Sequence, residues 1–266
     1  MNRIMTLMFL AFLLLQTRFV AYADVADTVF VLSSNDKGWD VDDLGNLYVF
    51  DSYELRRYNK DKELTATFSS REFGPIGSLD VLDPLRPALF YPMFSKIVEL
   101  DQSLSISATW TPDIGSIGQS LIGSRSAGQG YWLYDELDLK PVKFDQSGKT
   151  VLQGTSLSTI ETGNVLISSM LCNGQWMVLN DKSFGFFIYD QFGTFSFKLV
   201  SPGSELAGMS KMDLYYRSQK GVIRRNFRTG FETTYPFNWA TDLNAVRVRN
   251  DKVFVQIGKL ILEYSL

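Results

Sequence analysis

Short apolar and aromatic runs alternate with polar turn residues along most of the chain. The runs are rich in β-branched and aromatic side chains, which favour pleated, half-buried strands. Asp, Asn, Gly and Ser separate the runs, as is typical of tight turns between strands. The pattern predicts an all-β fold, and the clearest runs are residues 47–50, 88–91, 96–100, 131–134, 175–179, 185–189, 213–216, 252–255 and 260–264.

The runs occur in pairs, and the pairs repeat along the chain. Successive pairs end at Asn59, Asp101, Asp145, Asp190, Asn226 and Ser265. A spacing of about 40 residues with four short strands in each repeat is typical of the blades of a β-propeller. We therefore predict a six-bladed β-propeller with four short antiparallel strands in every blade.

The last repeat is one strand short. Its strands are expected at 243–249, 253–256 and 260–264, while an additional apolar strand at 28–33 precedes the first repeat. An unpaired sheet edge promotes aggregation, so a closed ring is favoured over an open one. The N-terminal strand 28–33 is therefore predicted to close the last blade as its outer strand.

The first repeat, residues 39–60, contains a motif. Asp42 begins an Asp-x-x-Gly-Asn turn that ends at Asn46, and an aliphatic-Tyr-Val-x-Asp strand follows and ends at Asp51. A third strand then covers residues 55–60. This segment resembles a blade of NHL-repeat propellers, and the later repeats keep the spacing of the motif rather than its letters. The resemblance implies a propeller fold and says little about function.

The first 23 residues are typical of a secretory signal peptide. Arg3 precedes an apolar run at 4–15, and Ala21-Tyr22-Ala23 forms a small-x-small cleavage site. The run is shorter than the roughly 20 residues that span a bilayer, although an uncleaved anchor is the alternative. We expect residues 24–266 to form a single propeller domain, exported to the periplasm or the cell exterior, with no transmembrane segment after signal cleavage.

The amino-acid composition excludes several kinds of catalytic site, metal site and partner. The chain has no histidine, which excludes Ser-His-Asp and Cys-His catalysis and every zinc site that needs His. Its net charge of −3 argues against general binding of nucleic acid, which needs concentrated Lys and Arg. Cys172 is the one cysteine and lies in an apolar strand, so we expect a buried small hydrophobe rather than a reactive thiol or an intermolecular link.

Carboxylates leave a metal-dependent function open as an alternative. Residues 40–46 have the oxygen-rich composition of a calcium loop but lack the distant bidentate acid of an EF-hand, and a hairpin turn explains them without a metal. Lactonase-type propellers, in the broader six-bladed group, hold a divalent metal over the channel with Glu, Asp and Asn. Solvated turns are the favoured explanation for the acids that follow second strands here: Asp51, Asp135, Glu136, Asp138 and Asp181. We expect no bound metal and no cofactor.

Apolar residues follow the second strand of several blades on the same expected side of the ring. Tyr53, Phe94 and Leu137 come shortly after these strands, and Phe184 is nearly equivalent in the fourth blade. Outward-pointing apolar side chains rimmed by acids are typical of a protein-binding patch. Packing within the blades is the alternative. The predicted binding face consists of Asp51, Tyr53, Phe94, Asp135, Leu137, Asp181 and Phe184.

A basic segment follows in the fifth repeat. It contains Arg217, Lys220, Arg224, Arg225 and Arg228. These residues suit an acidic partner, a lipid headgroup or an anionic glycan. A solvated outer strand is the favoured explanation.

These features together predict a non-enzymatic interaction or scaffold module in the cell envelope. The expected partner is another envelope protein, with a glycan as the alternative, and not a nucleic acid. A receptor for a glycan or small molecule is the first alternative, and a metal-dependent lactonase-type hydrolase is the second. Propellers carry out all three functions, so the fold does not choose between them.

Overall fold

The computed structural model describes residues 27–266 except 114, 116, 119, 121, 127–129 and 238–242, and describes burial from Phe30 onward. The predicted signal peptide, residues 1–23, lies outside this part of the chain. Within the described residues, no helix is long and apolar enough to cross a membrane. Apart from strands, the assigned elements there are two short 3-10 helices, η1 (Pro92–Phe94) and η2 (Leu157–Thr159).

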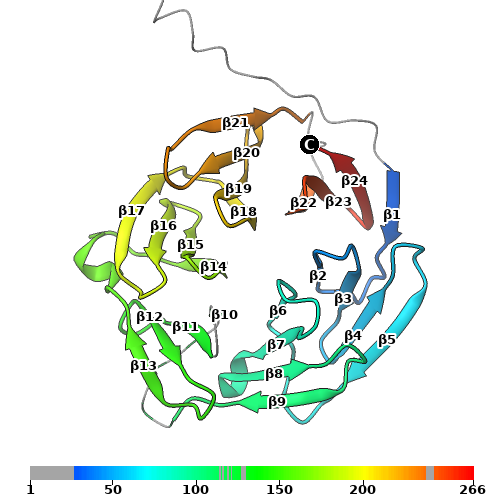
Figure 1. Ribbon diagram of the computed structural model, residues 1–266, viewed down its shortest axis with the longest axis horizontal. Helices are drawn as coiled ribbons and strands as arrows, with labels where there is room; N and C mark the ends of the chain where they lie inside the picture. The colour runs from blue at the N-terminus through cyan, green and yellow to red at the C-terminus, as the bar shows by residue number, and fades with distance from the viewer. Residues whose placement is uncertain are drawn as a thin grey trace, which may run out of the picture.

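The strands form six sheets of four antiparallel strands each, arranged as a closed ring (Figure 1). This confirms the predicted six-bladed β-propeller. From the centre outward, blade one contains β2 (Gly38–Val41), β3 (Leu47–Phe50), β4 (Glu54–Tyr58) and β5 (Leu64–Ser69); blade two contains β6 (Ser78–Asp80), β7 (Ala88–Tyr91), β8 (Lys96–Leu100) and β9 (Ile106–Trp110); blade three contains β10 (Gly123–Arg125), β11 (Tyr131–Asp135), β12 (Lys140–Phe144) and β13 (Thr150–Gln153).

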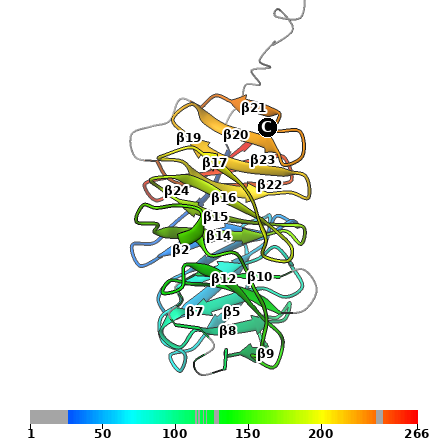
Figure 2. The same cartoon turned by 90° about the vertical axis from the view of Figure 1, so that its left-hand side faces the viewer.

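The second half of the ring has the same order. Blade four contains β14 (Ile167–Cys172), β15 (Trp176–Asp181), β16 (Gly185–Asp190) and β17 (Phe195–Val200); blade five contains β18 (Glu205–Met209), β19 (Asp213–Ser218), β20 (Gly221–Asn226) and β21 (Glu232–Tyr235); blade six contains β22 (Leu243–Arg249), β23 (Lys252–Ile257), β24 (Leu260–Ser265) and β1 (Asp27–Val31). Seen from the edge, the ring is a disc with loops on both sides (Figure 2).

The two middle strands of each blade are the ones that the sequence pattern detects. All four residues of β3 and β7 are buried, and so are five of the six in β16. These strands face a neighbouring blade on each side, so both sets of alternating side chains are apolar and the run is continuous. The outer strands β5 and β9 are mostly exposed, which explains why they leave a weaker signal.

Each junction between neighbouring blades has its own hydrophobic cluster. Blades one and two share Tyr48, Leu55, Leu89 and Tyr91, and equivalent clusters occupy the other five junctions. Four of the five tryptophans pack in or against these clusters, at Trp39, Trp110, Trp132 and Trp176; the fifth, Trp239, lies outside the described residues. The ring is thus held by six small cores rather than one central core.

The N-terminal strand closes the ring, as predicted. β1 pairs antiparallel with β24, with Phe30 opposite Ile261 and Val31 opposite Leu260. The strand covers residues 27–31 rather than 28–33. Leu32 lies just beyond it, donates its backbone N–H to the carbonyl of Lys259 at 2.7 Å, and is buried in the cluster between blades six and one. The two ends of the described chain therefore meet in one sheet.

Candidate functional site

The disc has two sides with different turns. We call face A the side that carries the turns between the second and third strands of the blades, residues 51–53, 92–95, 136–139, 182–184, 219–220 and 258–259. Face B is the opposite side, which carries the turns between first and second strands and between third and fourth strands. Because the strands are antiparallel, the loops that lead from one blade to the next also lie on face A.

Two of the predicted binding residues, Asp51 and Asp181, hold face A turns in place. Asp51 Oδ1 accepts the backbone N–H groups of Tyr53 and Glu54 at 2.7 and 2.8 Å. Asp181 Oδ1 accepts those of Ser183 and Phe184 at 2.6 and 3.0 Å. Each carboxylate thereby closes the turn that follows its strand.

The carboxylates of blades three and four are buried. Asp135 is 3% exposed, and its oxygens accept the backbone N–H groups of Leu137 at 3.0 Å and Gly118 at 3.1 Å. Asp181 is 1% exposed, and its Oδ2 accepts the backbone N–H of Leu166 at 2.6 Å. Both therefore tie a turn to the loop that enters their blade. The rim of face A is consequently less acidic than the sequence suggested.

The apolar members of the predicted face differ in exposure. Phe94 is 52% exposed and Leu137 is 72% exposed, while Tyr53 is 36% exposed. Phe184 is half-buried, because its ring packs beside that of Phe187 and the ammonium of Lys198 lies 4.6 Å above its centre. Tyr53, Phe94 and Leu137 thus point outward from three consecutive blades.

Two further exposed apolar residues extend this row. Met93 and Leu166 are 66% and 69% exposed, and neither belongs to a motif that singles it out. The loop between blades one and two connects the row, because its Arg71 lies over the ring of Tyr53 and its Gly74 lies against Met93. We call Tyr53, Met93, Phe94, Leu137 and Leu166 the apolar arc.

Face B also exposes large apolar side chains. Leu44 and Leu85 lie in the first turns of blades one and two, with 56% and 55% exposure. Phe192 and Phe231 lie in the outer turns of blades four and five, with 61% and 64% exposure. Exposure alone therefore does not distinguish the two faces, and these residues provide matched controls for face A.

The structure does not gather the predicted basic residues into one patch. Arg217 pairs with Glu205 at 2.9 Å, Arg224 with Asp213 at 2.7 Å, and Arg225 with Glu232 at 2.7 Å. Lys220 lies in the face A turn of blade five, whereas Arg228 lies beyond β20 on face B. The segment runs across the blade, and the acids that neutralise its middle come from neighbouring strands.

The innermost strands enclose a channel with a cavity of about 440 Å³. A buried ion pair joins blade six to blade one, since Arg249 Nη2 lies 3.1 Å from Asp40 Oδ2 and Arg249 Nε donates to the carbonyl of Val41 at 3.0 Å. Lys182 pairs with Glu205 at 3.3 Å at the junction of blades four and five. No described residue of the channel lining is aromatic. The lining combines polar residues with apolar ones such as Leu79, Met170 and Leu206. Its acids Asp40, Asp80 and Glu205 are already engaged.

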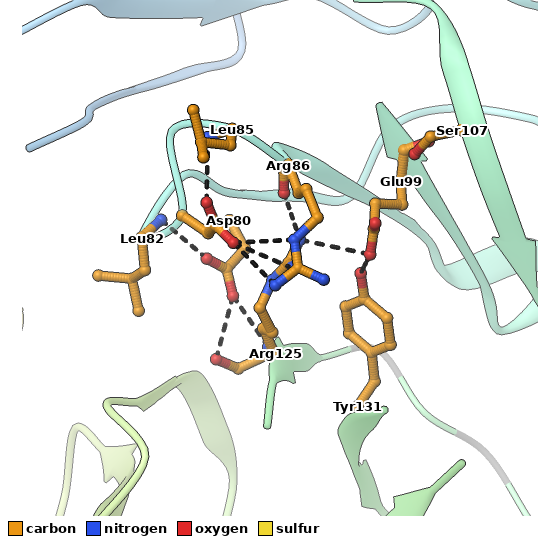
Figure 3. A network of polar contacts seen from close by, with 10 residues as sticks. Asp80, Leu82, Leu85, Arg86, Glu99, Ser107, Arg125 and Tyr131 are labelled. Atoms are coloured by element: carbon orange, nitrogen blue, oxygen red, sulfur yellow. Dashed lines mark hydrogen bonds and ion pairs between the residues drawn. The ribbon is translucent and has the colours of Figure 1, made fainter. Parts of the chain in front are cut away.

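A second polar network joins blades two and three near the face B mouth of the channel (Figure 3). Arg125 Nη2 lies 3.5 Å from Glu99 Oε2, and the backbone N–H of Arg125 donates to Asp80 Oδ2 at 2.9 Å. Tyr131 donates its hydroxyl to the same Glu99 oxygen at 2.9 Å. Burial raises the pKa of the Tyr131 phenol, which keeps the hydroxyl as a donor. Asp80 and Glu99 are therefore fixed as links between blades.

The carboxylate of Asp42 accepts hydrogen bonds from its own turn, residues 42–46, and from Tyr48. Asp42 Oδ1 accepts the backbone N–H groups of Leu44 and Asn46 at 2.9 and 2.8 Å, and Oδ2 accepts the Tyr48 hydroxyl at 3.2 Å. Among the residues that the structure describes, no three His, Cys, Asp or Glu side chains are grouped so that they could hold a metal ion.

Glu136 and Asp138 stay at the surface, where Asp138 pairs with Lys140 at 2.7 Å.

Cys172 is buried in the inter-blade cluster, as predicted. Burial raises the pKa of its thiol to about 12, so at pH 8 only about one thiol in ten thousand is ionised. We expect iodoacetamide to leave native Cys172 unmodified under conditions in which the urea-unfolded chain reacts completely, because the thiolate is the nucleophile. Mass spectrometry measures the modified fraction, and rapid labelling of the native protein would contradict a buried thiol.

The fold is similar to that of several solved structures. Virginiamycin B lyase from Staphylococcus aureus has a TM-score of 0.62 and 10% identity, covering 91% of this chain and 99% of that one. A streptogramin B lyase has a TM-score of 0.58 and 12% identity, covering 87% and 79%. The WD40 domain of Neurospora crassa Pan2 has a TM-score of 0.60 and 6% identity, covering 92% and 97%. At these identities the likeness shows the fold alone.

Comparisons of the sequence do not assign the chain to a family. No family model matches the chain, and no curated protein matches it either. The NHL-type motif of blade one therefore remains a resemblance, while the propeller fold is established by the structure and its neighbours.

Proposed function

We propose that this protein is an exported, non-enzymatic binding module of the cell envelope, which docks another protein on face A. The observation that carries the proposal is the apolar arc, in which Met93, Phe94, Leu137 and Leu166 each have more than half of their surface in water. Such side chains on neighbouring turns are typical of an interaction surface. Export rests on the signal peptide pattern at residues 1–23.

The turns that carry the arc are held in fixed shapes. Asp51 and Asp135 accept the backbone N–H groups of Tyr53 and Leu137, as described above, and the η1 turn holds Met93 and Phe94. A rigid turn loses little conformational entropy when a partner covers its side chains, so more of the burial free energy appears as affinity. Loops on a rigid framework are also the usual place for recognition residues.

The arrangement of acids supports binding over catalysis. Asp40 and Glu99 are engaged by arginines, and Asp135 and Asp181 by backbone donors. A structural neighbour, virginiamycin B lyase, is described as catalytically inactive when one histidine is replaced by alanine. This chain contains no histidine, so the proposal does not extend that chemistry to it.

A receptor for a small polar molecule in the channel is the second candidate. Its support is the cavity of about 440 Å³, whose lining includes the side chains of Ser78, Ser124 and Ser169. Sugars are commonly bound by stacking on aromatic rings as well as by hydroxyl contacts. The described channel lining offers hydroxyls without an aromatic ring, so we place this candidate behind the docking surface.

The docking proposal predicts a loss of partner binding without a loss of stability. Substituting Met93→Ser together with Phe94→Ser should weaken the complex by about 30-fold or more, since truncating a central apolar anchor costs about 2 kcal/mol of binding. The matched control on face B is Phe192→Ser, at similar exposure. The readout is the affinity of a partner first cross-linked to the wild-type protein in extract of the source cells, with melting temperature measured in parallel.

Each outcome of this comparison has a defined meaning. Loss of the partner from the face A variant alone, with an unchanged melting temperature, supports docking on face A. Loss from Phe192→Ser alone moves the interface to face B. Retention by both variants rejects the apolar arc as the contact, and early melting of the face A variant shows that Met93 and Phe94 pack the blade instead.

A further inference from the structure

A pocket of about 290 Å³ opens on face B at the junction where blade six meets blade one. Its floor contains Phe30 of β1, Tyr58 of β4 and Phe254 of β23. Leu44 lies at its rim with 56% of its surface exposed. The volume is close to the lower end of the range for small-molecule sites, about 300–1,000 Å³. The pocket lies on the opposite side of the disc from the apolar arc.

The floor of this seam pocket is aromatic. The rings of Phe30 and Tyr58 lie 4.6 Å apart at 54° and come from the two sides of the junction. Phe254 is 4% exposed and continues into the cluster formed with Val41 and Leu47. A flat or branched apolar group placed here would exchange water for ring contacts on several sides, which is the main source of affinity for small ligands. The channel offers no such surface among its described residues.

Most of the charged residues in the lining are already engaged by other groups of the protein. Its four bases are Lys60, Lys62, Lys252 and Arg249, and its three acids are Asp42, Asp43 and Glu263. Arg249 is already paired with the buried Asp40 at 3.1 Å, so the charged groups at the pocket balance one another.

The acids of the lining are partly engaged by the protein itself. The carboxylate of Asp42 is turned into its own loop by four donors, and Glu263 pairs with Lys252. Lys60, an exposed residue of the outer turn of blade one, extends along Gly45 at the pocket edge. The ammonium of Lys60 is therefore placed to contact a single negative group of a ligand at the pocket edge.

We propose that the seam pocket binds a small monoanion with an aromatic or branched alkyl body. The apolar body lies on Phe30, Tyr58 and Phe254, and the anionic group lies toward Lys60. Such a ligand contacts β1, blade one and blade six together, so it binds the closed ring and not a ring opened at this junction. Binding therefore stabilises closure by mass action. This proposal is independent of docking on face A.

Anilinonaphthalene sulfonate is a suitable probe, because it combines a flat aromatic body with one negative charge, and phenylnaphthylamine is its uncharged counterpart. We expect the sulfonate to bind the wild-type protein with one-site stoichiometry and to raise the melting temperature by about 5 °C at a hundredfold excess over its dissociation constant. Lys60→Gln should weaken the sulfonate at least about tenfold and leave the uncharged probe unchanged. The matched control is Lys149→Gln, an exposed lysine in the corresponding turn of blade three.

A second pair of variants locates the probe. Leu44→Glu should abolish sulfonate binding, because it places a carboxylate at the rim, whereas Leu85→Glu in the equivalent turn of blade two should not. Both leucines are more than half exposed, so both variants should fold with near wild-type melting temperatures. Equal effects of the paired variants, or equal affinity for the charged and uncharged probes, would overturn the proposal. No saturable binding by the wild-type protein would also overturn it.

Discussion

Removing residues 27–31 should make the protein aggregate, or lower its melting temperature by about 10 °C or more. The deletion removes the outer strand of blade six, so β24 loses its partner on one side. It also removes Phe30 from its contact with the ring of Tyr58. The exposed backbone groups of β24 would then be free to pair with other chains. Thermal unfolding and light scattering measure the two consequences.

A control and a rescue make this test specific. Val31→Thr keeps the strand and changes a side chain that is 60% exposed, so it should melt within about 1 °C of the wild-type protein. A synthetic peptide of residues 27–34, added to the deletion variant, should restore part of the lost stability, because an extended peptide can pair with an open sheet edge. A soluble deletion variant with unchanged melting temperature would show that β1 does not secure the ring.

Asp40→Ala should lower the free energy of unfolding by about 3 kcal/mol, which corresponds to about 6–12 °C in melting temperature for a domain of this size. Arg249 has 4% of its side chain exposed, so the substitution leaves a guanidinium without its ion-pair partner in the interior. The charge cannot be neutralised by deprotonation, because arginine stays protonated in proteins. Urea unfolding measures the change, provided that the slope of the transition is unchanged.

Two further variants separate the ion pair from simple packing. The double variant Asp40→Leu with Arg249→Leu should recover much of the lost stability, because replacing both charges removes the unpaired one. Lys182→Ala breaks the exposed contact with Glu205 and should cost less than about 1 kcal/mol. If Asp40→Ala unfolds like Lys182→Ala, the buried pair does not contribute to ring closure.

Much of the candidate site could be predicted from the sequence, because each propeller turn is formed by residues that are close together in the chain. The position of Tyr53, Phe94 and Leu137 after second strands already predicted a common side of the ring. Their solvent exposure could not be predicted in this way, since exposure depends on the loop that arrives from the preceding blade. Phe184 illustrates this, because Gly163 of the loop that enters blade four lies against its ring, beside Phe187 and Lys198 of the same blade, whereas Leu137 stays in water.

Charged residues show the clearest difference between sequence and structure. The sequence shows Arg217, Arg224 and Arg225 as a basic cluster in one repeat. Their acidic partners lie on neighbouring strands at Glu205, Asp213 and Glu232, and only strand pairing brings them together. Charge that is concentrated along the chain is therefore dispersed and neutralised in space.

The sequence alone determined the number of blades, the strand pairs and the closing strand of this protein. These features follow from short-range rules, because each blade buries the same kind of middle strand and most turns use Asp, Asn or Gly. Only the tertiary structure decided which polar side chains are engaged and where pockets open. The pair of Asp40 with Arg249 joins residues from opposite ends of the chain, and the contact of Phe30 with Tyr58 forms because β1 completes blade six beside blade one, so both depend on ring closure.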